Sequence, residues 1–75
     1  MEARVKNVFA AVFKCRPDEI KEGFSMDTVA SWDSLKHLTL IAALEQEFGI
    51  TIEPDEIIAA DTYAAVLRLV QLKTA

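Results

Sequence analysis

The spacing of apolar side chains predicts a helix from about Ala3 to Lys14. Apolar residues recur there at the i, i+3, i+4, i+7 intervals that place them on one helical face. Polar residues such as Lys6 and Asn7 fall largely outside that face. Pro17 interrupts the pattern, because proline disfavours helical backbone in the residue before it. The apolar face consists of Val5, Val8, Phe9, Val12 and Phe13.

Residues 16–33 show no clear period and predict a long loop, with a short helical turn around residues 18–22. A loop of this length is uncommon in a compact domain and is often functional. Scattered apolar side chains should hold it against the other helices. These are Ile20, Phe24, Met26, Val29 and Trp32.

A second helix is expected from Asp33 or Ser34 to about Phe48. Aspartate and serine are both strong N-cap residues, and Gly49 supplies a residue that tolerates the left-handed conformation at the other end. Leu40 and Leu44 share the predicted core face with His37, which we expect to be hydrogen-bonded and to tie this helix to the long loop.

Two further helices complete the pattern. Pro54 suits a first helical position, so a short helix should run to about Ala60. Thr62, with Asp61 before it, caps a last helix from Tyr63 to about Lys73. The chain is therefore expected to be all-α, a small bundle of three main helices plus one short helix, with a long loop between helices one and two.

Composition then narrows the classes of function. A chain of 75 residues is one small domain, here taken as residues 1–75, and it buries only ~60% of its unfolded surface. The net charge of −4 argues against nucleic acid and anionic membranes as partners. One cysteine (Cys15) and one histidine leave no zinc site, and no apolar run reaches a membrane span or signal peptide. We therefore expect a cytoplasmic, non-enzymatic monomer, or a domain excised from a longer chain.

The negative charge is local. Between Asp33 and Asp61 there are seven acidic residues and one basic residue, Lys36, so this segment carries −6 and the remainder +2. Such a surface suits a basic partner. Within this segment, Leu35, Leu38 and Ala42 form a second apolar stripe outside the core face, and we expect it to be exposed.

Ser34 is the most informative polar residue. At a helix N-terminus, free backbone N–H groups and the positive end of the helix dipole favour a phosphate. The motif Asp33-Ser34-Leu35 is short, and taken alone it is explained by helix capping. The context of the motif favours a functional role beyond capping, because the motif follows a long loop and begins a helix flanked by an apolar stripe and an acidic surface.

Residues 33–50, from Asp-Ser-Leu to Glu-Phe-Gly-Ile, resemble the second helix of acyl carrier proteins. The similarity extends to the helix-one stripe, to Pro-Asp-Glu at 17–19 and 54–56, and to Asp-Thr at 61–62. The resemblance implies that Ser34 carries 4′-phosphopantetheine from coenzyme A, with an acyl or aminoacyl group held as a thioester. It also implies that Asp33 helps a phosphopantetheinyl transferase place Mg²⁺ and coenzyme A.

The same resemblance implies a docking face for loading and acyl-using enzymes with basic surfaces. The residues expected there combine the exposed apolar stripe with nearby polar and acidic positions. They are Leu35, Lys36, Leu38, Thr39, Ala42, Glu45, Glu47, Asp55 and Glu56.

Three positions depart from fatty-acid-synthesis carriers. Lys36 and Thr39 stand where acidic residues are usual, and Trp32 stands where small residues are frequent. The pattern looks more like stand-alone carriers of secondary-metabolite, surface-polysaccharide or modified-lipid pathways. Trp32 has two interpretations: it packs over the open end of the bundle, or it gates entry of an acyl chain between helices two and three.

One alternative function stays open, namely an acidic helical interaction module without a prosthetic group that binds a partner helix through the apolar stripe. A helix-turn-helix DNA binder is disfavoured because the second helix has only Lys36 as a base. An enzyme is disfavoured because no acid–base pair or metal constellation is visible.

Overall fold

The computed structural model describes all 75 residues and contains four α-helices and no strand. The helices are α1 (Glu2–Phe13), α2 (Ser34–Phe48), α3 (Pro54–Ala59) and α4 (Tyr63–Thr74), and a 3₁₀ turn, η1, spans Pro17–Glu19. The expected small all-α bundle of three main helices and one short helix is confirmed. None of these helices is long and apolar enough to cross a membrane.

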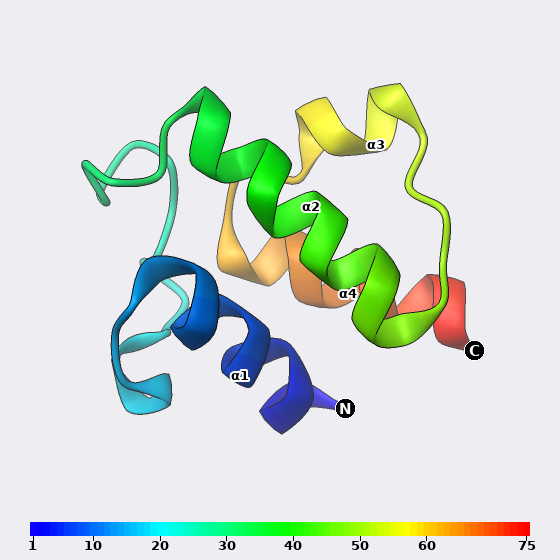
Figure 1. The fold of residues 1–75 in the computed structure, drawn as a ribbon, viewed down its shortest axis with the longest axis horizontal. Coiled ribbons are helices and arrows are strands. Elements are labelled where there is room, and N and C mark those ends of the chain that lie inside the picture. Colours follow the sequence, from blue (N-terminus) through cyan, green and yellow to red (C-terminus); the bar gives the residue numbers. More distant parts are fainter.

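Three helices pack closely against one another and the fourth stands apart. α1 packs against α2 and α4, and α2 also contacts α4. The short α3 lies along the upper side of the molecule in Figure 1 and packs less closely against the other helices. The start of α2 is at the upper edge and both termini are on the lower side, so residue 34 lies far from the chain ends.

The ends of the four α-helices agree with the sequence prediction to within one residue, whereas the helical turn expected around residues 18–22 is the 3₁₀ turn Pro17–Glu19 and ends three residues earlier. α2 ends at Phe48 as expected, and Gly49 adopts the left-handed conformation with φ 64°. α1 stops at Phe13, one residue early, because Lys14 itself takes a left-handed conformation with φ 55°. Ala60 is likewise outside α3 and serves as its C-cap.

The long loop is held against the bundle, as its apolar residues predicted. Ile20 and Trp32 are buried in the core, and the other apolar loop residues pack on it half-buried. Two backbone hydrogen bonds join the loop to the α3–α4 link and to the start of α4: Met26 N–H donates to Asp61 O at 3.0 Å, and Tyr63 N–H donates to Phe24 O at 2.8 Å. The loop therefore reaches α2 from a fixed position.

An aromatic cluster fills the core between α1, the loop and α4. Phe9 lies at its centre, fully buried, with ring centroids of Phe13, Phe24, Trp32 and Tyr63 between 5.3 and 5.9 Å away. Only 13 of the 75 residues are buried, so this cluster makes up a large part of a thin core. Trp32 therefore packs into the bundle, in agreement with the first of the two interpretations given for it above.

Candidate functional site

Ser34 is the first residue of α2 and is exposed to solvent. Its backbone N–H and that of Leu35 have no hydrogen-bond partner within the protein, since the first amides of a helix lack intrahelical acceptors. The hydroxyl and two unpaired N–H groups are therefore at the positive end of a 15-residue helix. An anionic group bonded to the Ser34 oxygen would meet donors already in place.

Asp33 is the N-cap of α2. Its Oδ1 accepts a hydrogen bond from the Lys36 N–H at 2.8 Å, which satisfies one of the helix's free donors. Asp33 is exposed, so its other carboxylate oxygen remains accessible to a bound ion or enzyme. The cap fixes where α2 begins and hence where Ser34 lies.

Replacing Asp33 with alanine should therefore lower the free energy of unfolding by about 1 kcal/mol, the usual loss for an N-cap. Asp33→Asn keeps a capping oxygen and should stay within a few tenths of a kcal/mol of the native protein. Urea denaturation followed by circular dichroism measures both values. Equal losses in the two variants would show that charge rather than capping explains the contribution of Asp33.

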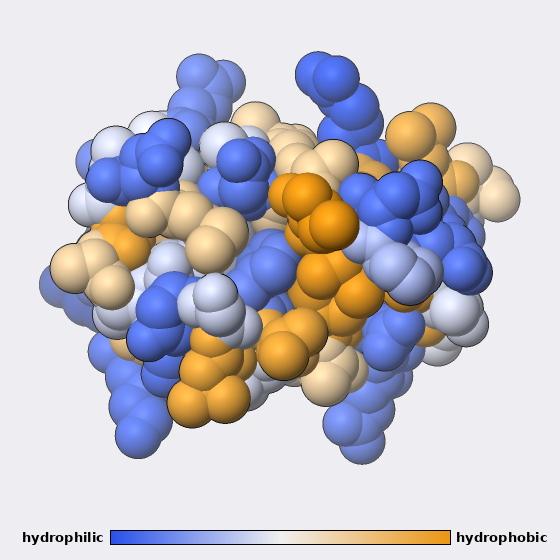
Figure 2. Space-filling view, turned by 90° about the horizontal axis from the view of Figure 1, so that it is seen from above, coloured by the Kyte–Doolittle hydropathy of each residue, from blue (hydrophilic) through white to orange (hydrophobic).

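The apolar stripe predicted on α2 is exposed. The exposed fraction is 76% for Leu35 and 59% for Leu38, and Ala42 is also exposed. The structure adds Ile58 of α3, 79% exposed, which the sequence reasoning missed. Figure 2 shows this side of the molecule from above, with apolar atoms through the middle of the face and hydrophilic residues around them.

One signal could have revealed Ile58. Adjacent residues on a helix point about 100° apart, so the doublet Ile57-Ile58 cannot bury both side chains beneath a six-residue helix. Ile57 is the half-buried member and packs against the core. Ile58 is left on the surface.

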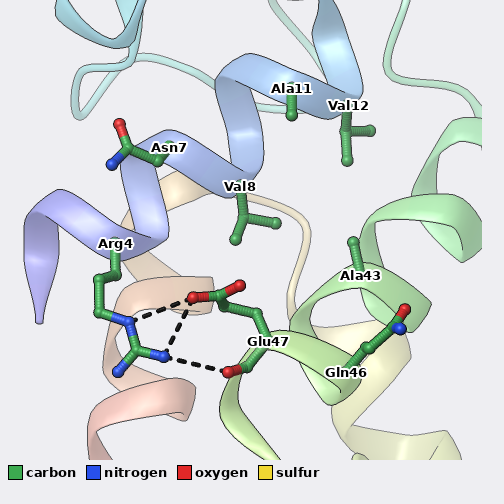
Figure 3. A pocket seen from close by; sticks show the side chains of 8 residues that line it. All are labelled: Arg4, Asn7, Val8, Ala11, Val12, Ala43, Gln46 and Glu47. Atoms are coloured by element: carbon green, nitrogen blue, oxygen red, sulfur yellow. Dashed lines mark hydrogen bonds and ion pairs between the residues drawn. The ribbon is translucent and has the colours of Figure 1, made fainter.

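Several acidic residues proposed for docking have partners within the protein. Glu47 pairs with Arg4 of α1 at 3.0 Å across a surface groove between α1 and α2 (Figure 3). It lies thirteen residues beyond Ser34, or about 20 Å along the helix. Glu45 Oε2 accepts the Ile52 N–H at 2.8 Å. A docking role for these two carboxylates stays a prediction, and both are already engaged.

Of the two acidic residues of α3 predicted for docking, one has a partner within the protein and the other has none. The Glu56 carboxylate accepts a hydrogen bond from the Lys73 ammonium of α4 at 2.8 Å, which holds the pKa of Glu56 below its ordinary value. Asp55 is exposed and has no ion pair. Of the two acidic residues predicted for docking on α3, Asp55 is thus the one whose charge is not paired.

Lys36 and Thr39 complete the predicted set. Lys36 is half-buried, and its ammonium forms no ion pair. Thr39 is exposed, and its hydroxyl donates back to the Leu35 carbonyl oxygen at 3.1 Å within the helix. Together with Ser34, Leu35, His37 and Leu38, these residues form the first turn and a half of α2, directly after the N-cap Asp33.

Cys15 lies outside this region, after the end of α1. Burial, with smaller contributions from Glu19 and Asp18, raises the pKa of its thiol, which lowers the thiolate fraction and hence the reactivity. No three histidine, cysteine, aspartate or glutamate side chains come together in a way that could hold a metal ion.

Comparison with known protein families matches residues 3–70 to the PP-binding family, described as the phosphopantetheine attachment site. The chain belongs to this family. The resemblance to acyl carrier proteins is therefore confirmed, and so is the cofactor, 4′-phosphopantetheine, which the family attaches covalently. None of the curated proteins compared with the chain matches it significantly.

The structure fits this cofactor. A phosphopantetheine attachment domain needs an accessible hydroxyl and donors for a phosphodiester, and the start of α2 offers both at Ser34. Carrier domains of this kind are typically not catalytic themselves. Family membership favours a carrier over an interaction module without a prosthetic group.

Proposed function

We propose that Ser34 is the residue to which 4′-phosphopantetheine is attached. The observation that carries this proposal is the position of Ser34, exposed at the first residue of α2 beside two unpaired backbone N–H groups and within the matched range. The phosphodiester formed on Ser34 would gain from those donors and from the helix dipole.

The attached arm supplies a terminal thiol on which an acyl or aminoacyl group is carried as a thioester. In the transfer from coenzyme A, a bond forms between Ser34 Oγ and the phosphorus nearest the pantetheine. The pyrophosphate bond breaks, adenosine 3′,5′-bisphosphate leaves, and the hydroxyl proton passes to solvent or a base of the transferase. This chain contributes the nucleophilic oxygen, and Asp33 supplies a carboxylate that helps the transferase to place Mg²⁺ and coenzyme A.

We further propose that partner enzymes dock on the face made by the start of α2 and by α3. Leu35, Leu38 and Ile58 give this face exposed apolar area, and the free carboxylate of Asp55 lies near it on α3. Acidic charge steers encounters with basic enzymes and supports fast exchange between them. A carrier that passes cargo from one enzyme to the next needs such short-lived complexes.

Lys36 and Thr39 support service in a specialised pathway rather than in housekeeping fatty-acid synthesis. They place a cation and a neutral hydroxyl beside Ser34 instead of carboxylates, so the local charge differs from what those enzymes meet on their own carriers. Loading and turnover by an elongating fatty-acid synthase at the rate of a housekeeping carrier would contradict this proposal.

The attachment is tested by incubating the protein with coenzyme A, Mg²⁺ and a broad-specificity phosphopantetheinyl transferase. Intact mass spectrometry should show the addition of one phosphopantetheine, and peptide mapping should locate it on Ser34. Thiol titration after unfolding should rise from one group, Cys15, to two. An unchanged mass would contradict the carrier function and favour the interaction module.

A further inference from the structure

His37 bridges two hydrogen-bonding groups that come from different parts of the chain. The Trp32 indole Nε1–H donates to His37 Nδ1 at 2.9 Å, and His37 Nε2 lies 2.7 Å from the Ile57 carbonyl oxygen. An indole nitrogen can only donate and a carbonyl oxygen can only accept. The imidazole must therefore be neutral, with its proton on Nε2, to make both hydrogen bonds.

The bridge joins three segments around Ser34. Trp32 lies two residues before Ser34, His37 is in the first turn of α2, and Ile57 is in α3. His37 is only 7% exposed, and no buried side-chain polar atom in the protein lacks a hydrogen-bond partner. Removing the imidazole would leave the indole N–H and the carbonyl oxygen without their present partner, which is costly for buried groups.

The position of α3 depends strongly on this bridge, because α3 is short and has few other contacts. It has six residues, none of them fully buried, and it does not pack closely along any other helix. Besides the packing of Ile57 against the core, two polar side-chain contacts tie it to the bundle, namely His37 to Ile57 O from α2 and Lys73 to Glu56 from α4. Both contacts are partly buried, and His37, at 7% exposed, is less accessible to solvent than the Lys73 and Glu56 side chains, at 23% and 30%.

The contact between His37 and Ile57 also joins the two helices that carry the proposed docking face. His37 stands in the chain between Leu35 and Leu38, and Ile57 precedes Ile58. A shift of α3 would therefore change the position of Ile58 relative to the two leucines. The arrangement of α2 and α3 that a partner enzyme meets therefore depends on the hydrogen bond between His37 and the Ile57 carbonyl oxygen.

We propose that His37 is a positioning residue for the modification of Ser34. Its bridge from Trp32 to the Ile57 carbonyl fixes α3 and the end of the loop against α2, so that the transferase meets one geometry of the docking face. This inference rests on the proposed carrier function. It predicts an effect on recognition, and none on the chemistry at the hydroxyl.

The bridge is first tested in the native protein by NMR. Long-range ¹H–¹⁵N spectra should show His37 as the Nε2–H tautomer, and the indole N–H of Trp32, the only tryptophan, should exchange slowly with solvent. A proton on Nδ1, or rapid exchange of the indole N–H, would overturn the proposal without any variant.

Two substitutions then separate hydrogen bonding from packing. His37→Phe keeps a ring but removes both hydrogen bonds, whereas His37→Gln retains one acceptor and one donor. We expect His37→Phe to raise the KM of the transferase for the carrier roughly five- to tenfold, the equivalent of one lost hydrogen bond, with kcat within about twofold. His37→Gln should recover most of the KM, and the exposed Gln46→Ala on the same helix should leave it unchanged.

Native KM in His37→Phe, a fall in kcat alone, or no recovery in His37→Gln would overturn the proposal. If His37→Phe does not fold, Trp32→Phe removes the indole donor and keeps a smaller aromatic ring at this buried position, so the same rise in KM is expected. Failure of the native protein to accept phosphopantetheine would instead overturn the carrier function itself. The two failures are therefore distinguishable.

Discussion

Replacing Ser34 with alanine should abolish phosphopantetheine addition completely while leaving the fold intact. The hydroxyl oxygen is the proposed nucleophile, and alanine has no atom that can replace it. Alanine is well tolerated in a helix, and Ser34 is exposed with no side-chain hydrogen bond in the structure. The free energy of unfolding should therefore change by no more than about 0.5 kcal/mol.

The chain offers a matched control in Ser31, an exposed serine three residues earlier in the loop. Ser31→Ala should accept one phosphopantetheine at the native rate, and Ser34→Ala should accept none, as read by intact mass after saturating incubation. Addition to Ser34→Ala would move the attachment to another residue. Loss in both variants would point to damage to the start of α2 rather than to a missing nucleophile.

The helices could be predicted from the sequence because their signals are local. Apolar spacing defines α1 and α2, Gly49 ends α2, and Pro54 and Thr62 begin the last two helices. The exposure of Leu35 and Leu38 followed from the same geometry, since a helix in so small a bundle cannot bury two separate faces. The candidate serine followed from its place at a helix start and from the family resemblance.

Partners distant in the sequence could not be predicted. Arg4 and Glu47 are 43 residues apart, and His37 and Ile57 are 20 apart, so no periodicity relates either pair. The count of seven acids between Asp33 and Asp61 therefore overstated the free acidic charge, because Glu47 and Glu56 form ion pairs. That His37 contacts α3 as well as the long loop is likewise a property of the assembled fold.

The thin core has a consequence for how the carrier tolerates change. A protein whose chemistry resides on a flexible arm needs no enclosed pocket, so its interior can be devoted to packing. Phe9, Trp32 and their neighbours fill that interior with rings whose edges and faces are in contact. Stability consequently depends on a few large side chains, whereas recognition depends on exposed ones.

Phe9→Ala is expected to cause one of the largest losses of stability among single truncations in the core. Phe9 is fully buried and contacts four other aromatic rings, so alanine would leave a cavity that none of three packed segments can fill. The expected loss is about 3–5 kcal/mol, against a total of about 4–11 kcal/mol for a chain of 75 residues.

The half-buried Phe48, whose ring lies 4.6 Å from the Arg4 guanidinium carbon, provides the matched control. Phe48→Ala removes the same atoms from the edge of the bundle, where neighbours and water can close over the gap, so it should lose about half as much or less. Guanidinium denaturation followed by circular dichroism gives both values, and Phe9→Leu extends the comparison if Phe9→Ala is already unfolded. Equal losses at the two positions would mean that the cost of truncation depends on side-chain size and not on position in the core. The aromatic cluster would then contribute no more to stability than the edge of the bundle.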